Sequence, residues 1–225
     1  MQKPPQTPES IAMNHSALPA QPVTLYRMAL SGHCHRVQLF ASLIGLPLTL
    51  VDVDVMQGEH KKPPFIALNA FGQVPVMQDG DVTLADSNAI LVYLEARYAP
   101  GHWLPRDPLG AAAVQRWLSV AAGQVAFGPA AARVIELFKK PVPADECISR
   151  AVALFGVMDA ELAKTPFLAG SKPTLADVAN YAYIAHAPEG NVSLAPYAHL
   201  RAWLARVEAL PGFVPMARSA VGLAA

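Results

Sequence analysis

The first half of the chain begins with a strand pattern, a helix pattern and a second strand pattern. Residues 23–29 form a short apolar run typical of a strand, and residues 33–44 carry apolar side chains at helical spacing. A glycine and a proline follow this helix and end it. Over residues 51–55, valines alternate with aspartates, which is the period of a strand with one solvent-exposed face. This order predicts a βαβ unit with parallel strands.

The pattern then changes to a hairpin and a second helix. Residues 74–77 and 82–84 predict two short strands, and Asp79-Gly80 between them is a tight-turn signal. Residues 86–88 are all good N-cap residues, and they precede an apolar helical face that ends near Tyr98. The first half therefore has the layout of a thioredoxin-like α/β domain.

The second half shows helical patterns and no strand signal. Helices are expected over residues 111–125, 148–162, 178–187 and 200–210. Thr174 and Asp177 have the spacing of a capping box. The expected organisation is an arm over 1–22, an α/β domain over 23–99, a proline-rich linker over 100–108 and an all-α helical bundle over 109–225.

Composition and charge narrow the function classes. Hydrophobic residues make up 53% of the 225 residues, enough for a packed core, and 17 basic residues balance 17 acidic ones. This balance excludes a nucleic-acid binder that works by bulk positive charge. No stretch reaches the roughly 20 apolar residues of a membrane span, so no membrane partner is expected. Two distant cysteines exclude a disulfide framework and a cysteine-rich zinc site, so we expect a cytoplasmic protein with no metal.

Candidate chemistry begins at the junction of the first strand and helix. Ser31 precedes the helix, whose N-terminus directs free N–H groups at anything bound there. A hydroxyl at this turn can stabilise a thiolate, although Ser31 could also serve only as a helix cap.

Three other segments add recognition groups. Pro75, if it is cis, would present the backbone of Val74 to an extended peptide, although it could be an ordinary edge-strand proline. Asp86 and Ser87 could hold an ammonium and a carboxylate, or they could only cap the helix. Residues 58–62 supply cationic donors, or form a solvated loop. Taken together, the segments suit a small peptide with two carboxylates, one amine and a thiol.

The motifs that carry these residues resemble the glutathione S-transferase family, most closely its bacterial and theta-like members. The similar stretches are LYRMALSGHCHRV, NAFGQVPVM and LADSNAILVYL in the first half and PTLADVANYAY in the second. The resemblance covers about residues 23 to 215. It implies glutathione as co-substrate, a homodimer, and a transferase that uses the glutathione thiolate to attack a small electrophile.

The resemblance also implies a role for each matching position. Ser31 matches the serine that hydrogen-bonds the glutathione sulfur, and Asp177 matches a residue that caps a buried helix. The glutathione-contact positions are His60, Lys61, Gln73, Val74, Pro75, Asp86 and Ser87.

The sequence leaves the sulfur-contacting group and the electrophile site open. Cys34 stands three residues after Ser31, near where beta-class members use a cysteine, so a thiol–disulfide oxidoreductase is an alternative. A non-enzymatic glutathione-binding module is another. Trp117, Phe127 and Arg133 are the candidates for the electrophile pocket, with a core position as the alternative for the aromatic pair.

Overall fold

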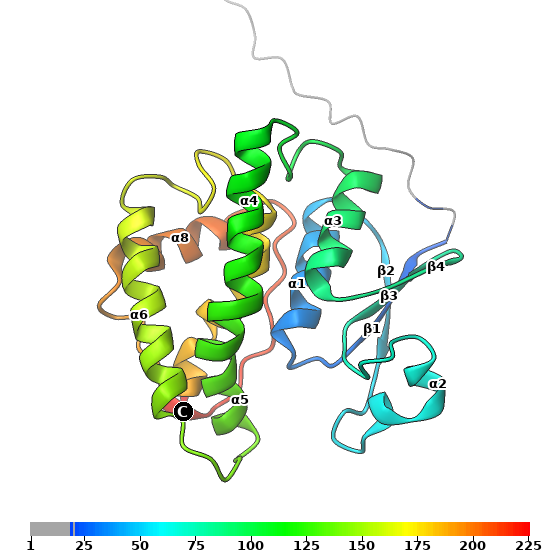
Figure 1. Ribbon diagram of the computed structural model, residues 1–225, viewed down its shortest axis with the longest axis horizontal. Coiled ribbons are helices and arrows are strands. Elements are labelled where there is room, and N and C mark those ends of the chain that lie inside the picture. The colour runs from blue at the N-terminus through cyan, green and yellow to red at the C-terminus, as the bar shows by residue number, and fades with distance from the viewer. Residues whose placement is uncertain (1–18, 20) are drawn as a thin grey trace, which may run out of the picture.

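A computed structural model describes residue 19 and residues 21–225 of the chain (Figure 1). Apart from residues 19, 21 and 22, the arm expected over residues 1–22 lies outside this description.

A four-stranded mixed sheet organises the first domain. Its strands are β1 (Val23–Arg27), β2 (Leu48–Asp52), β3 (Val76–Asp79) and β4 (Val82–Ala85), in the order β2-β1-β3-β4. β1 and β2 run parallel, whereas β3 runs antiparallel to both β1 and β4. The predicted α/β thioredoxin-like layout of a βαβ unit followed by a ββα unit is therefore confirmed.

Helices cover both faces of this sheet. On one face, α1 (Gly32–Leu43) and α3 (Ser87–Tyr98) pack against alternate strand residues such as Leu25 and Met77. The opposite face carries η1 (Glu59–Lys61) and α2 (Pro63–Ile66), whose Phe65 packs with Val53 and Val76. Figure 1 shows α1 and α3 between the sheet and the helical domain, with α2 on the far side.

The second strand lies three residues earlier than the valine alternation predicts. β2 pairs with β1 from Leu48 opposite Val23 to Asp52 opposite Arg27. After Arg27 the chain turns toward α1, so β2 has no neighbouring strand to pair with beyond Asp52. Val53 still donates its N–H to the Arg27 carbonyl at 2.7 Å, but Val55 already lies in a turn.

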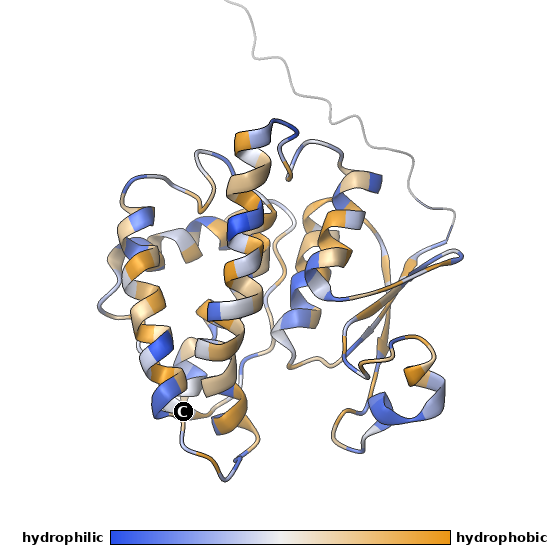
Figure 2. Ribbon diagram, in the orientation of Figure 1, coloured by the Kyte–Doolittle hydropathy of each residue, from blue (hydrophilic) through white to orange (hydrophobic). Residues whose placement is uncertain are grey.

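The second domain is all helical and begins after the irregular segment 99–107. Its elements are α4 (Pro108–Val120), η2 (Ala121–Ala130), α5 (Ala131–Leu137), α6 (Asp145–Leu162), α7 (Leu175–Ala185), η3 (Ala187–Gly190), α8 (Ala198–Glu208) and η4 (Gly222–Ala224). Orange and blue alternate along α4 and α6 in Figure 2, as expected of helices with one buried side. The α5 helix was not predicted.

The run from Pro108 to Leu137 is long and apolar enough to cross a membrane by composition alone. In the structure it is the central helical run of the second domain. It buries Trp117 and Val125 in the core, and it bends at Gly128, where a Cβ would lie 3.2 Å from the backbone of α6.

The last part of the chain joins the two domains. One hydrophobic core extends from the sheet through α1 and α7 into the helical bundle. The Ser42 hydroxyl of α1 donates to the Gly212 carbonyl at 2.6 Å, and Nε2 of His35 lies 2.8 Å from the Val214 carbonyl. We call residues 212–219 the C-terminal strap; its pale red trace runs between α1 and the helical domain in Figure 1.

Candidate functional site

A cleft of about 780 Å³ lies between the two domains, at the end of the sheet where α1 and α3 begin. It contains every position that the sequence predicts to contact a peptide ligand: Ser31, His60, Lys61, Gln73, Val74, Pro75, Asp86 and Ser87. Four separate segments of the first domain therefore meet at one site.

Ser31 stands at the N-terminus of α1 and lines the cleft. It is the N-cap residue, with extended backbone angles, and its Oγ accepts a long hydrogen bond of 3.4 Å from the backbone N–H of Cys34. The helix dipole and its free N–H groups favour negative charge at this point. The junction is therefore suited to an anionic sulfur.

Cys34 lies one turn further into α1 and faces the core. Its side chain is buried, and its Sγ accepts the Met28 backbone N–H at 3.4 Å. Burial raises the pKa of the Cys34 thiol, against smaller opposing contributions from its hydrogen bonds. Cys34 does not line the cleft. Its geometry is that of a packed, protonated thiol.

The loop before β3 presents an open backbone edge to the cleft. The Val74–Pro75 peptide bond is cis. Buried Asn69 fixes the loop, because its Nδ2 donates to the Gln73 carbonyl at 2.8 Å and its Oδ1 accepts the Phe71 N–H at 3.1 Å. Among the described residues, none bonds the N–H or the carbonyl of Val74. Both groups remain available to an extended ligand.

The same loop packs against the cationic segment. Gly72 has φ +55°, and a Cβ there would lie 2.8 Å from the His60 carbonyl and 2.9 Å from the Lys61 side chain. Only glycine permits this close approach. Lys61 Nζ donates to the Phe71 carbonyl at 3.1 Å, and Nδ1 of His60 is buried with no partner among the described residues. These two residues provide donors at one end of the cleft.

Asp86 and Ser87 form the other polar end, at the start of α3. Asp86 is the N-cap, and its Oδ1 accepts the N–H groups of Asn88 and Ala89, both at 2.9 Å. Within the described part of the chain, its Oδ2 has no partner. Ser87 is buried and lines the cleft.

A buried cation lies directly behind Ser87. Arg36 of α1 is 2% exposed, and its Nη1 donates to Ser87 Oγ and to Asn88 Oδ1, both at 2.8 Å. Burial lowers the pKa of Arg36 to about 10, so it stays charged at neutral pH. No carboxylate in the described residues forms an ion pair with it. Because a guanidinium has no lone pair, Ser87 must accept from Arg36, and its own hydrogen can point to a ligand carboxylate.

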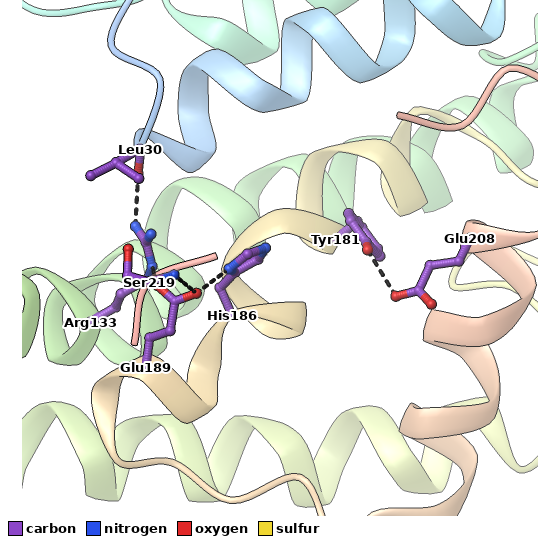
Figure 3. Close-up of polar contacts among 7 residues, drawn as sticks. All are labelled: Leu30, Arg133, Tyr181, His186, Glu189, Glu208 and Ser219. Atoms are coloured by element: carbon purple, nitrogen blue, oxygen red, sulfur yellow. Dashed lines mark hydrogen bonds and ion pairs between the residues drawn. The ribbon is translucent and has the colours of Figure 1, made fainter. Parts of the chain in front are cut away.

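The helical domain closes the cleft with α5 and α7. Arg133 of α5 is buried, and its Nη1 donates to the Leu30 carbonyl at 2.8 Å, immediately before Ser31. Its Nε donates to Glu189 at 2.7 Å. The other Glu189 oxygen contacts His186 at 2.5 Å and accepts the Ser219 N–H at 3.2 Å (Figure 3). This network joins the loop that bears Ser31 to the second domain and to the C-terminal strap.

Of the three residues expected at an electrophile pocket, only Arg133 lines the cleft. Trp117 is 3% exposed, and its position on the buried face of α4 makes it a core residue. Phe127 is 63% exposed, because η2 turns it away from both the core and the cleft. The structure therefore does not bring these two side chains to the cleft. Val134 and Phe138, near the C-terminal end of α5, supply the apolar wall instead.

Sequence reasoning missed several residues of the site. Arg36 and Tyr183 belong to apolar helical patterns that gave no sign of the cleft. Asn69 lies in a polar turn, and asparagine is a recognisable turn signal in a sequence. Within the described residues, no group of three or more His, Cys, Asp or Glu side chains could hold a metal ion.

Comparisons with known proteins agree with this geometry. Residues 21–96 match the family model of the glutathione S-transferase N-terminal domain, and residues 123–211 match that of the C-terminal domain. Glutathione S-transferase 3 of Zea mays is 35% identical over 208 residues, covering 85% of this chain and 91% of the relative. Human glutathione S-transferase theta-2 is 35% identical over 186 residues, covering 78% and 76%.

A solved structure is similar over almost the whole described chain. A glutathione S-transferase from Pseudomonas fluorescens superposes with a TM-score of 0.82 at 32% identity, covering 87% of this chain and 99% of that one.

Proposed function

The chain belongs to the glutathione S-transferase family and is a glutathione transferase, and from this premise we propose that Ser31 activates the thiol of glutathione for attack on a small electrophile. The observation that carries the proposal is the position of Ser31, which caps α1 inside a cleft bounded by the open backbone edge at Val74 and by two polar ends.

In this proposal, glutathione lies extended across the cleft. The backbone of Val74, held by the adjoining Gln73 and Pro75, pairs with the cysteinyl unit. The Oδ2 atom of Asp86 receives the γ-glutamyl ammonium, and Ser87 donates to the neighbouring carboxylate.

The remaining carboxylate of glutathione lies at the opposite end of the cleft. His60 and Lys61 meet the carboxylate of the glycine unit there, with Gln73 beside them. The two anionic ends of the tripeptide therefore meet donors at both ends of the cleft.

The sulfur is activated by hydrogen bonding rather than by a base. A hydrogen bond to a charged group is worth roughly 1.5–3 kcal/mol, and one pKa unit corresponds to about 1.36 kcal/mol. One bond from Ser31 therefore lowers the pKa of the bound thiol by roughly one to two units, and Ser31 keeps its own proton on average.

The electrophile would enter from the side of the helical domain. Val134 and Phe138 offer it an apolar wall, and Arg133 lies at the sulfur end. The reaction class within this proposal is conjugation, dehalogenation or peroxide reduction by the thiolate. Each begins with the same sulfur attack, on carbon or on peroxide oxygen.

Replacing Ser31 with alanine tests the proposal. We expect Ser31→Ala to lower kcat at neutral pH by about 10- to 100-fold, because one charge-assisted hydrogen bond to the thiolate is lost. The dissociation constant of glutathione, measured by calorimetry, should change much less, since the rest of the tripeptide is bound elsewhere. Turnover would be measured with a chromogenic aryl halide.

Cys34→Ala is the matched control, and it also addresses the alternative oxidoreductase. Its activity should equal that of the wild type, because Cys34 is buried away from the cleft. Full activity in Ser31→Ala together with loss of activity in Cys34→Ala would overturn the proposal in favour of cysteine chemistry.

We further propose that the protein is a cytoplasmic homodimer. Two free cysteines, Cys34 and Cys147, are compatible with a reducing compartment. Family membership supports the dimer. Sedimentation velocity that shows only the single-chain mass of 23.9 kDa would contradict it.

A further inference from the structure

Arg36 is a buried cation that no carboxylate of the described chain neutralises. It lies in α1 and is 2% exposed, and none of the ion pairs among the described residues involves it. Its Nε is buried and has no hydrogen-bond partner there. Buried charges in proteins are normally paired, because desolvating an isolated charge is costly. The unpaired charge therefore points to an anion that comes from outside the described chain.

Two acceptors fix the guanidinium at the start of α3. Its Nη1 donates to Ser87 Oγ and to Asn88 Oδ1, both at 2.8 Å. The Asn88 amide is held in this orientation, because its Nδ2 donates to the Leu118 carbonyl of α4 at 3.1 Å. The charge is thereby held against Ser87, which itself lines the cleft.

Ser87 connects this charge to the cleft. Its oxygen already accepts from Arg36, so its single hydrogen remains for a ligand. A hydroxyl that accepts from a cation becomes a stronger donor, because successive hydrogen bonds polarise one another. An anionic oxygen that accepted this hydrogen would lie about 5 Å from the guanidinium nitrogen, roughly two hydrogen-bond lengths away. Opposite charges at this distance attract each other appreciably in a partly buried site.

We propose that Arg36 is a positioning residue, whose unpaired charge selects the α-carboxylate of the γ-glutamyl unit of glutathione through Ser87. The inference rests on the proposed function and deepens it by naming the charge that this end of the cleft recognises. Asp86 stands beside Ser87, and in the proposed binding mode its Oδ2 receives the ammonium of the same unit. The two side chains therefore recognise a zwitterionic amino-acid head group, one charge of each sign.

Arg36→Gln tests this role, because it removes the charge and keeps an N–H donor near Ser87. Calorimetry compares glutathione with 4-aminobutanoyl-cysteinylglycine, which keeps the amine and the chain length but lacks the α-carboxylate. The ratio of the two dissociation constants measures how strongly the site prefers the carboxylate. We expect this preference to fall about 10- to 100-fold in Arg36→Gln, because a charge-assisted contact is lost. Affinity for the analogue should change little.

Further variants separate the effect of charge from the effect of shape. Arg36→Lys keeps a positive charge and should retain most of the preference. Arg36→Met is a second uncharged variant and should lose the preference as Arg36→Gln does, so the test stands even where one of them does not fold.

Arg27→Met is the matched control for the loss of an arginine that bonds α1. Arg27 donates to Gln38 Oε1 of α1 at 2.7 Å, but it pairs with Asp52 and does not line the cleft. Both dissociation constants should equal those of the wild type.

Two results would overturn the inference. One is a wild-type preference for the carboxylate in the uncharged variants. The other is an equal loss in Arg36→Lys and Arg36→Gln, which would mean that the shape of the side chain matters and its charge does not. A wild-type protein that binds the two ligands equally would instead refute the proposed placement of the γ-glutamyl unit, so the two failures are distinguishable.

Discussion

Asp86 has a backbone conformation that few residues other than glycine adopt, with φ 70° and ψ 120°. Such strain persists only where the surrounding structure holds it, and it tends to occur at functional sites. Here Asp86 lines the cleft, and its Oδ1 caps α3. In the proposed binding mode, this one side chain both stabilises a helix and contacts the ligand.

Asp86→Asn separates the helix-capping role of this side chain from its proposed contact with the ligand ammonium. Asparagine caps helices well and tolerates positive φ, so the melting temperature should change little. Its amide nitrogen cannot accept from an ammonium, however, so affinity for glutathione measured by calorimetry should fall about tenfold. A glutathione analogue without the amino group should bind both proteins equally. A tenfold loss with that analogue too would contradict the proposed contact.

At the scale of residues, the sequence identified polar residues at the boundary between a strand and a helix, where a side chain can cap the helix and reach a ligand. Ser31 and Asp86 each follow a strand and precede a helix, and the structure places both in the cleft. Arg36 and Tyr183 could not be found in this way. Each lies within a helix: Arg36 acts from behind Ser87 through packing of α1 against α3, and Tyr183 reaches the cleft only because the two domains pack together.

The long helical run of the second domain shows what limits prediction at the level of elements. A Gly-Pro pair usually ends a helix, and the helix predicted here stops at residue 125. Instead Gly128 takes non-helical angles for a single residue, and the chain continues as α5. The bend is favoured because it brings Gly128 against the backbone of Ala151 in α6, a tertiary contact that no local pattern encodes. The capping box at Thr174, in contrast, is entirely local, and its prediction is confirmed.

Asp177 makes the start of α7 a sensitive point for stability. Its carboxylate accepts four bonds: from the N–H groups of Leu168 and Thr174, the Thr174 hydroxyl and Nε1 of Trp203. We expect Asp177→Asn to lower the free energy of unfolding by at least about 3 kcal/mol, because an amide nitrogen would face buried donors. Urea titration measures this loss.

Thr174→Ala is the comparison for Asp177→Asn. It removes one side of the same capping box and should cost only about 1 kcal/mol. An equal or larger loss in Thr174→Ala would show that the four bonds to Asp177 do not set the stability of α7.

Considered as a whole, the molecule carries buried imidazoles where its two domains meet. Nε2 of His35 donates to the Val214 carbonyl of the C-terminal strap, and its Nδ1 is buried without a partner among the described residues. Burial lowers the pKa of His35 from 6.5 to about 4. The folded protein therefore holds this side chain neutral at pH values where the unfolded chain binds a proton.

This shift predicts a loss of stability in acid. Neutral His35 contributes fully to the free energy of unfolding above the unfolded pKa of 6.5, and that contribution is lost as pH falls toward the folded pKa of about 4. Glutamine at position 35 can still donate to Val214 but does not titrate. Between pH 7 and 5, we expect the wild type to lose about 2 kcal/mol more of its unfolding free energy than His35→Gln.

Denaturant titrations at several pH values measure this difference. The control is His199→Gln, which replaces an exposed histidine on α8 and should follow the wild-type curve. Identical pH dependence in His35→Gln and the wild type would show that His35 is not held neutral by the fold.

The C-terminal strap bonds to the rest of the protein through its own main chain: the carbonyls of Gly212 and Val214 accept, and the N–H of Ser219 donates. Such bonds depend little on which side chains the strap carries. Replacements at its exposed positions, Pro215, Ala217 and Arg218, should therefore be absorbed easily, whereas adding or deleting one residue would shift every later attachment out of reach. Evolution can therefore vary the exposed side chains of the strap but has to preserve the number of residues between its attachments.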